Sequence, residues 1–371
     1  MVECSLAAKN DKKEIIELID YVFSYDYEPH DFKSYLPKVY ADEVDGLGAK
    51  HYIIKENGGI KAVVAIKEID IVYCGLTLKA GGVGSVAVHP DSRGKGYMSA
   101  LMEFAIEDAR KNGLQILFLS GKRQRYGYFG FENGGIVYNF TVSAANVKHA
   151  LADVDVSGIS YKEITNQMEN EIKIACKLHN EQPCRVKRSE DEFLRIVNSW
   201  GDKPYAIYKN GKMIGYSVGI LGELVLKDES DYAAVLKKMF EGLDKTTIPV
   251  GSFERGKIEF LSAFCEDYSI RHDKKLCVLD WKSVLSVLLT LKSKTVRLTD
   301  GEAAFNIDGE CIGISVKNNN VTVVDIDETV TATALSHNSA QRMFFELDGL
   351  LGGKFGNWFP LPFYVDHADT F

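Results

Sequence analysis

Residues 83–98 have the sequence Val-Gly-Ser-Val-Ala-Val-His-Pro-Asp-Ser-Arg-Gly-Lys-Gly-Tyr-Met, and this stretch decides the fold. Val83 to Val88 alternate small and β-branched residues, which predicts a strand that ends at His89-Pro90. The basic glycine turn Arg93-Gly94-Lys95-Gly96 follows. Apolar residues then recur at helical spacing, at Met98, Leu101, Met102, Ala105 and Ala109. A glycine turn that leads into a helix presents unpaired N–H groups and a favourable dipole, so this stretch suits a pyrophosphate.

The composition of the chain excludes several classes of protein. The chain has 371 residues, of which 46% are hydrophobic and 26% charged, and this composition predicts a soluble globular protein of two or three domains. The longest apolar run, Val284 to Leu291, has about half the length that a bilayer requires, so no membrane span is expected. The net charge of −8 disfavours nucleic acid as a partner and is compatible with cationic small molecules.

The cysteine pattern indicates a reducing compartment. Seven cysteines form no Cys-x-x-Cys pair, and the N-terminal residues predict no secretory signal. We therefore expect a cytoplasmic protein with reduced thiols and no metal. His367 with Asp366 and Asp369 is better explained as a hydrogen-bonded surface cluster than as a metal site.

Residues 1–143 predict a mixed α/β domain. Asp11 to Tyr25 has the spacing of an amphipathic helix, and Leu114 to Ser120 is a continuous apolar run typical of a buried central strand. Before the glycine turn we expect strands at 52–54, 60–66 and 69–78. After the turn we expect a helix that ends at Asn112-Gly113.

Residues 144–277 repeat this mixture of predicted strands and helices, as a degenerate copy of the first domain. We expect a helix at 169–180, a hairpin across Asn210-Gly211, a strand at 221–227 and a helix at 231–241. The turn between that strand and that helix, Asp228-Glu229-Ser230, is acidic and lacks glycine, so it would repel a pyrophosphate. We expect this segment to bind no coenzyme.

Residues 278–371 predict an α+β layer, with an antiparallel sheet and helices on one side. The helix Trp281 to Leu291 precedes short strands at 296–298, 303–307, 313–316 and 321–326 and a helix at 339–347. The apolar face of the first helix suits a lipid tunnel, but the core face of an ordinary helix explains it more simply.

A second motif makes the pattern more specific, and it is Arg125-Tyr126-Gly127-Tyr128-Phe129-Gly130-Phe131. The glycine turn resembles the acetyl-coenzyme A-binding motif of the GNAT acyltransferases, with Met98 where most members have Gly or Ala. Both motifs together, with a final Phe371, resemble the Eis (enhanced intracellular survival) family of acetyltransferases. That resemblance implies two GNAT-like mixed-sheet domains, 1–143 and a degenerate 144–277. It also implies a sterol carrier protein 2-like α+β domain, 278–371.

The same resemblance implies roles for particular residues. The backbone of Val86, Ala87 and Val88 would hold the pantetheine arm of acetyl-CoA, and Ser120 belongs to the same coenzyme-binding set. Tyr126 would be the general acid, and the carboxylate of Phe371 would accept the proton of the substrate amine. The pyrophosphate would lie on the loop formed by Arg93, Gly94, Lys95, Gly96, Tyr97 and Met98.

Both catalytic assignments have simpler alternatives. Tyr126 is also explicable as a core tyrosine in an aromatic cluster, and Phe371 as a frayed terminus. Against the first, Tyr126 is followed by the motif Gly-x-Phe-Gly-Phe at 127–131. A phenol of pKa about 10 can supply a proton to a thiolate, which leaves readily because its thiol has a pKa of about 8.5. Against the second, the segment 358–364 is too aromatic for a loose tail.

The sequence predicts an acetyl-CoA-dependent N-acetyltransferase that acts on a primary amine of a cationic small molecule, such as an aminoglycoside, a polyamine or a lysine-like amine. Transfer is expected to occur directly in a ternary complex, because no cysteine has an adjacent His or Asp motif. The resemblance implies a homo-oligomer, trimeric or hexameric. Acidic residues that would favour a cation are Asp26, Glu28, Asp31 and Glu132. The alternatives are a non-enzymatic carrier of an apolar ligand through the C-terminal domain and an acyltransferase that uses longer acyl-CoAs.

Overall fold

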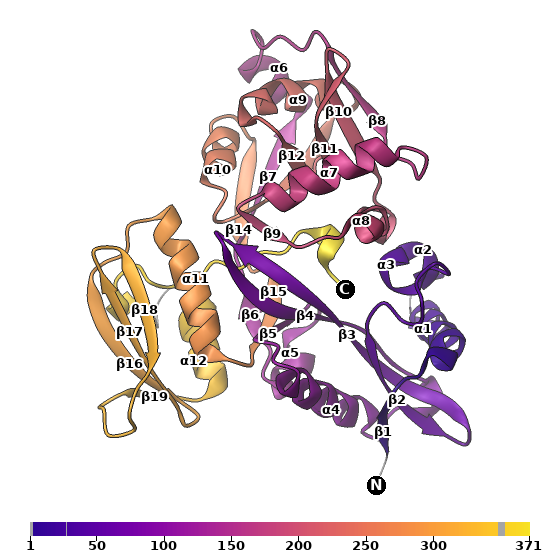
Figure 1. The fold of residues 1–371 in the computed structure, drawn as a ribbon, viewed down its shortest axis with the longest axis vertical. Coiled ribbons are helices and arrows are strands. Elements are labelled where there is room, and N and C mark those ends of the chain that lie inside the picture. Colours follow the sequence, from indigo (N-terminus) through magenta and orange to yellow (C-terminus); the bar gives the residue numbers. More distant parts are fainter. Residues whose placement is uncertain (1–2, 27, 348–352) are drawn as a thin grey trace.

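Two long strands, β3 (Gly59–Tyr73) and β4 (Leu76–Val88), form the centre of the sheet of the first region. In the computed structural model, which describes residues 3–26, 28–347 and 353–371, this sheet has the order β1-β2-β3-β4-β5-β15-β6, with β9 beside β3 (Figure 1). Only β4 and β5 are parallel neighbours in it. The other strands are β1 (Cys4–Leu6), β2 (Lys50–Glu56), β5 (Ile116–Leu119), β6 (Glu132–Gly134), β9 (Cys184–Val186) and β15 (Lys274–Val278).

The turn between β3 and β4 corrects the strand boundaries that the sequence predicts. In place of strands at 60–66 and 69–78, one strand runs through 59–73 and turns at Cys74-Gly75, where φ is 50° and 90°. No breaker interrupts the chain between Ile60 and Val72, so the pairing continues through it. The pattern misses the turn because Gly75 is its only turn residue and a cysteine, in place of Asn or Asp, precedes it.

The strand, turn and helix at 83–111 agree with the sequence prediction. β4 ends at Val88, α4 runs Tyr97–Lys111, and Gly113, with a φ of 76°, follows its end. Leu101 and Ala105 of α4 are buried in one apolar cluster with strand residues of the sheet. The other helices of this region are α1 (Lys12–Asp26), α2 (Phe32–Tyr35), α3 (Pro37–Tyr40) and α5 (Arg123–Tyr126).

The middle region has two sheets of its own, with the orders β12-β11-β10-β8 and β13-β7-β14. The hairpin predicted across Asn210-Gly211 joins β10 to β11. Sheet pairing crosses the predicted boundary between residues 143 and 144, because β7 pairs with the middle strands β13 and β14. β15, which itself spans the predicted boundary between residues 277 and 278, lies between β5 and β6 of the first sheet. The strands are β7 (Val137–Ser143), β8 (Ile159–Glu163), β10 (Pro204–Lys209), β11 (Lys212–Val218), β12 (Glu223–Leu226), β13 (Lys245–Gly251) and β14 (Asp267–Arg271), and the helices are α6 (Ala144–Ala150), α7 (Glu169–Glu181), α8 (Glu190–Val197), α9 (Tyr232–Met239) and α10 (Arg255–Ser262).

The third region is a four-stranded sheet of order β18-β17-β16-β19 with two helices. The strand predicted at 296–298 is wrong, because Leu298 N–H donates to the side chain of Asn319 rather than to a neighbouring strand. The sequence analysis also missed β19, which pairs in parallel with β16, so the sheet is not wholly antiparallel. The elements are α11 (Trp281–Thr295), β16 (Gly301–Ile307), β17 (Glu310–Lys317), β18 (Asn320–Asp325), β19 (Thr333–Leu335) and α12 (His337–Phe345).

The C-terminal tail returns to the first sheet. Figure 1 shows the chain end in the middle of the molecule, close to β3 and α8. Phe371 is 7% exposed and belongs to the same apolar cluster as Val39, Ala65 and Ala87. The last residue is therefore part of the core of the first region. Every helix within the described ranges is too short or too polar to cross a membrane.

Candidate active site

β4 and β5 are paired over only part of their length. The parallel ladder joins residues 80–82 to residues 116–118, while β4 continues to Val88. His89 N–H donates to Lys61 O of β3, 2.8 Å away. Because backbone groups alternate along a strand, the N–H groups of Val86 and Val88 are directed to the opposite edge, where β5 has separated. The same alternation directs the backbone of Ala87 toward β3.

A bulge interrupts β4 at the start of this open edge. Ala65 of β3 pairs with Gly84 and Val63 with Ala87, so β4 has one residue more than β3 between these two pairs. Ser85 lies in the bulge with a φ of 48°, a conformation that residues other than glycine rarely adopt. The bulge therefore alters the direction of the backbone just where the two strands part.

The loop after β4 presents backbone rather than charged side chains. Gly94 and Gly96 have φ of 79° and 78°, and a Cβ added at either would meet no protein atom within 4 Å. Gly96 is the N-cap of α4 and provides no side-chain cap, so the first N–H groups of the helix have no partner within it. The ammonium group of Lys95 is held by Glu56, at 2.8 and 2.9 Å from its two oxygens. An anion here would be bound mainly by amides and the helix dipole.

The remaining coenzyme-binding residues of the sequence prediction lie around this opening. The guanidinium of Arg93 lies 5.7 Å from the ring centre of Tyr25. Tyr97 is buried, Met98 is half-buried against the cluster of α4, and Ser120 is exposed directly after β5.

Tyr126 lies at the end of α5 and is 7% exposed. Its ring packs on Gly121, where an added Cβ would come within 2.5 Å of it, and meets Phe131 edge-on at 6.3 Å. Burial raises the pKa of the Tyr126 phenol, although Arg125 opposes the rise. Tyr126 therefore stays protonated at neutral pH. Tyr128 of the same motif is 90% exposed.

Phe371 packs directly on β4, in a place that only glycines leave free. A Cβ at Gly82 would lie 3.2 Å from the Phe371 Cβ, and one at Gly84 would lie 2.8 Å from its carboxyl carbon. Among the described residues, no ion pair or hydrogen bond joins that carboxyl group to a side chain. The group therefore lies beside the bulge, at the point where β4 leaves β5.

The tail that carries Phe371 is held by residues that sequence reasoning missed. The ammonium group of Lys38, which is 1% exposed, donates to Ala368 O at 2.6 Å and also to Thr370 O. Trp200 Nε1 donates to Thr370 O at 3.3 Å. Burial lowers the pKa of Lys38 to about 7, against the attraction of Asp369. Nothing in the sequence pattern distinguishes Lys38 from a surface lysine.

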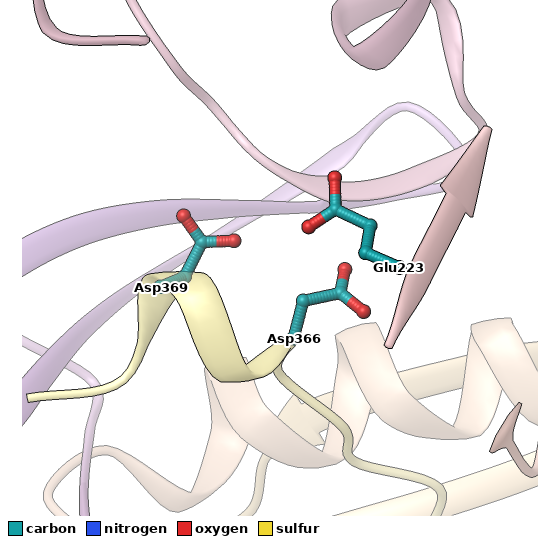
Figure 2. A group of neighbouring side chains, drawn as sticks. All are labelled: Glu223, Asp366 and Asp369. Carbon is teal, nitrogen blue, oxygen red and sulfur yellow. The ribbon is translucent and has the colours of Figure 1, made fainter. Parts of the chain in front are cut away.

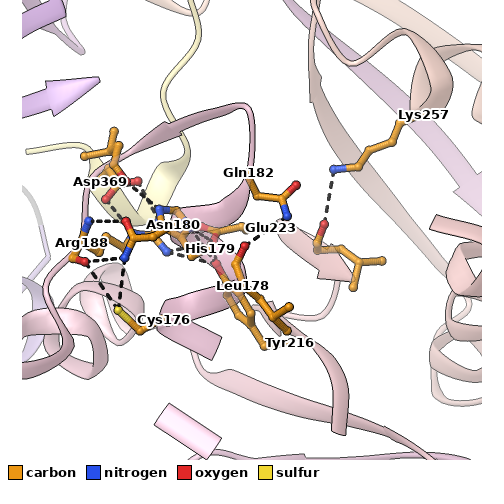
Figure 3. A network of polar contacts seen from close by, with 12 residues as sticks. Cys176, Leu178, His179, Asn180, Gln182, Arg188, Tyr216, Glu223, Lys257 and Asp369 are labelled. Carbon is orange, nitrogen blue, oxygen red and sulfur yellow. Dashed lines mark hydrogen bonds and ion pairs between the residues drawn. The ribbon is translucent and has the colours of Figure 1, made fainter. Parts of the chain in front are cut away.

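A buried arginine of the middle region holds the tail from the other side (Figure 3). Arg188 forms two hydrogen bonds to Asp369, of 2.7 and 3.0 Å, and two to Glu223, of 2.7 and 2.8 Å. Although burial acts to raise it, Arg188 and His179 hold the pKa of Glu223 well below its usual range.

Three carboxylates converge at the same place, as Figure 2 shows. Oxygens of Glu223, Asp366 and Asp369 lie within 4.8 Å of one another, an arrangement with the spacing of a cation site. Arg188 already bridges two of them. Burial, with the charges of Glu223 and Asp369, raises the pKa of Asp366 well above its usual range. The cluster is therefore explained by the arginine and a protonated Asp366.

Within the described part of the structure, the acidic residues expected to select a cation form no common cluster. Glu132 is buried between Arg123 and Arg342, which neutralise it. Asp31 caps the short helix α2 and is exposed, as is Glu28. The side chain of Asp26 lies outside the described part of the structure.

The comparison with known families agrees with this geometry. Residues 3–134 match the family model of the acetyltransferase (GNAT) domain. The chain is an acyltransferase. Its fold is shared over nearly its whole length with solved structures. A probable N-acyltransferase from Enterococcus faecalis V583 has a TM-score of 0.67 at 14% identity, over 93% of this chain and 90% of that one.

Two further solved structures have a similar fold. A GCN5-related N-acetyltransferase from Anabaena variabilis ATCC 29413 has a TM-score of 0.66 at 14% identity, over 95% of this chain and 93% of that one. Eis1 from Mycobacterium abscessus has a TM-score of 0.61 at 14% identity, over 92% of this chain and 88% of that one. A search of curated protein sequences gave no match.

Proposed function

We propose that this acyltransferase uses acetyl-CoA to acetylate a primary amine of a cationic small molecule. The observation that carries the proposal is the position of the Phe371 carboxyl group beside Gly84, at the bulge where β4 has left β5. A thioester held along the open edge of β4 would have its carbonyl close to that group.

The open edge and the glycine loop together supply the backbone donors that the coenzyme would need. The N–H groups of Val86 and Val88 are available to carbonyl oxygens of the pantetheine arm. Gly94, Gly96 and the first turn of α4 would bind the pyrophosphate through backbone amides. Acetyl-CoA is a substrate here and supplies the activated acetyl group.

The chemistry requires one proton acceptor and one proton donor. The amine nitrogen attacks the carbonyl carbon, and the carboxylate of Phe371 takes the proton that the amine loses. The carbon–sulfur bond then breaks, and the thiolate takes the phenolic proton of Tyr126. The raised pKa of Tyr126 supports this role, since a donor must be protonated before the thiolate forms.

The nature of the acceptor follows from the charge of the site. The Phe371 carboxylate would attract an ammonium group, which supports a cationic small molecule such as a polyamine, an aminoglycoside or a lysine-like amine.

The proposal also includes three domains, at 1–143, 144–277 and 278–371, of which the last is sterol carrier-like. It further includes a cytoplasmic location and a trimeric or hexameric assembly.

A thiol-release assay tests the proposal. The protein is mixed with acetyl-CoA and, in turn, with spermidine, kanamycin and lysine, and free CoA is measured. We expect release that depends on the amine and an acetylated amine as product. Tyr126→Phe should lower kcat about 10²-fold and leave the KM for acetyl-CoA nearly unchanged. Tyr128→Phe is the matched control, because that exposed phenol should be dispensable.

The same assay separates the alternatives. Faster turnover with decanoyl-CoA than with acetyl-CoA would favour a longer acyl donor. Binding of a fatty acid without any thiol release would favour a carrier. The apolar residues of α11, including Trp281, Leu285 and Leu288, are buried in the core that the third region shares with the first sheet, which supports the enzyme over the carrier.

A further inference from the structure

A short chain of buried polar groups ends at the β4 bulge. The Ser85 hydroxyl lies 2.6 Å from the Tyr40 hydroxyl, which lies 2.8 Å from His51 Nε2. The other ring nitrogen of His51, Nδ1, lies 2.9 Å from Ala49 O. The side chains of Ser85, Tyr40 and His51 are buried and come from β4, α3 and β2. These groups connect the bulge with the interior of the first region.

The protons of this chain can be assigned from its ends. A carbonyl oxygen only accepts, so His51 Nδ1 carries a hydrogen and donates to Ala49 O. Burial lowers the pKa of His51 to about 4, so the ring is neutral and Nε2 has no hydrogen. The Tyr40 hydroxyl must then donate to Nε2, and its oxygen accepts from the Ser85 hydroxyl. The polarity of all three bonds is fixed.

This polarity leaves Ser85 as a pure acceptor toward the site. Its single proton is used on Tyr40, and among the described residues no donor reaches the lone pairs of its oxygen. Ser85 adjoins Gly84, against which the carboxyl carbon of Phe371 lies. Tyr40 and Phe371 also belong to one apolar cluster, so the hydrogen-bonded side chains approach β4 from the side that Phe371 covers. The Ser85 oxygen and the Phe371 carboxyl group are therefore two acceptors at neighbouring positions of β4, next to the proposed place of acyl transfer.

We propose that Ser85 accepts one N–H of the attacking amine while the Phe371 carboxylate accepts the other, so that the enzyme selects primary over secondary amines. This inference rests on the proposed function. A neutral primary amine has two N–H groups and one lone pair. With both N–H groups held, the lone pair is directed at the thioester carbonyl. A secondary amine has one N–H and leaves one acceptor without a partner. Tyr40 and His51 are positioning residues that keep the Ser85 proton turned away.

The test compares a matched pair of amines, benzylamine and N-methylbenzylamine, with acetyl-CoA as donor. Wild-type protein should prefer benzylamine in kcat/KM, and Ser85→Ala should lower that preference about tenfold, the equivalent of one hydrogen bond. Alanine keeps the Cβ at the strained φ, so only the hydroxyl is lost. The KM for acetyl-CoA should not change. Tyr40→Phe should lower the preference in the same way, because the freed Ser85 proton would then face the carboxylate.

Two variants of His51 distinguish positioning from packing. His51→Gln keeps an acceptor for the Tyr40 hydroxyl and should retain most of the preference, whereas His51→Leu should lose it. Tyr52→Phe is the matched control, since it removes a buried hydroxyl that bonds Asp108 at 2.8 Å, in the cluster of α4. It should leave the preference unchanged.

The outcomes separate the inference from the function on which it rests. If wild-type protein releases no thiol with any amine of the first assay, the proposed function is wrong, and this inference falls with it. If wild-type protein turns over benzylamine and Ser85→Ala keeps the same preference, the enzyme stands and Ser85 has no role in selecting the amine. If Ser85→Ala does not fold, Tyr40→Phe and His51→Gln test the inference instead, through the same ratio of kcat/KM for benzylamine to that for N-methylbenzylamine.

Discussion

The first and middle regions each contain a strand that turns into a helix, and the two turns differ in how the helix is capped. At the β4–α4 turn, Gly94 and Gly96 leave the first amides of the helix open. At the β12–α9 turn, the Asp228 carboxylate caps the 3-10 turn Glu229–Asp231 that leads into α9: it accepts the N–H of Ser230 at 2.9 Å, and that bond lowers its pKa. The first turn leaves helix amides available to an external anion, whereas the second contains a carboxylate of its own.

This difference in capping indicates separate roles for the two strand–turn–helix arrangements. A glycine cap leaves a helix N-terminus available to a phosphate, while an internal carboxylate fills it and repels a second negative charge. The middle region contributes through Arg188 and Glu223 instead, which hold the tail that brings Phe371 to β4. Under the proposed function, the first region binds the coenzyme and the middle region positions the carboxyl group of Phe371.

Removing Arg188 should have the largest effect on stability. Arg188→Met leaves Glu223 with only His179 and Tyr216 and, among the described residues, removes the ion-pair partner of the buried Asp369, which we expect to lower the free energy of unfolding by about 3–5 kcal/mol. Urea denaturation measures it. Lys187→Met is the control, because Lys187 forms a half-exposed pair with Asp70 and should change stability by about 1 kcal/mol or less. Equal effects of the two variants would contradict the role of the middle region as a clamp.

Moving the Phe371 carboxylate should have the next largest effect, and on the rate alone. One glycine added after Phe371 replaces the carboxylate with an amide and shifts the charge by up to ~3.6 Å. We expect kcat to fall about 10²-fold or more, since misplacement by about 1 Å can already cost that much. The affinity for acetyl-CoA, measured by calorimetry, should stay within twofold. Full activity of the extended protein would remove Phe371 from the mechanism.

Part of the fold was predictable because its signals are local. The alternation at 83–88, the glycines before α4 and the stop at Asn112-Gly113 are read within a few residues, and these elements formed as predicted. The turn at Cys74-Gly75 and the absence of a strand at 296–298 were not predictable in this way. In the turn only Gly75 is a turn residue, and Leu298 is buried by contacts that come from distant parts of the chain.

The residues of the candidate site also divide into those with a local sequence signal and those without one. Motifs indicate Gly96 and Tyr126, because both stand in short recognisable sequences. Lys38, Ser85 and Arg188 have no such signature, since each acts through a partner more than 30 residues away. One local signal was available and unused. Gly82 and Gly84 alternate in a strand, which indicates that another group packs on that face, and Phe371 is that group.

A matched pair of glycine variants tests the role of the β4–α4 turn, with the β10–β11 hairpin as the reference. Gly96 and Gly211 both have positive φ, 78° and 77°, and open space around a new Cβ. Valine at either position should cost a similar amount of folding free energy, about 1–2 kcal/mol. Only Gly96→Val should weaken acetyl-CoA binding, by about tenfold or more, because its side chain would lie where the phosphate approaches the amides. Equal affinity in both variants, by calorimetry, would move the pyrophosphate elsewhere.

The smallest expected effect concerns the pH dependence of the tail clamp. Lys38 faces Asp369, Lys67 and Arg188, and burial lowers its pKa to about 7 in the folded protein. The unfolded chain, with a lysine pKa of about 10.4, therefore holds more protons above pH 7, and stability should rise with pH. From pH 7 to pH 8 this rise should be about 1 kcal/mol, and it should be absent in Lys38→Met. Lys33→Met, at an exposed lysine paired with Asp42, should follow the wild-type slope. Urea denaturation at both pH values measures each slope, and the same slope in Lys38→Met and wild type would mean that Lys38 stays charged while it holds the tail.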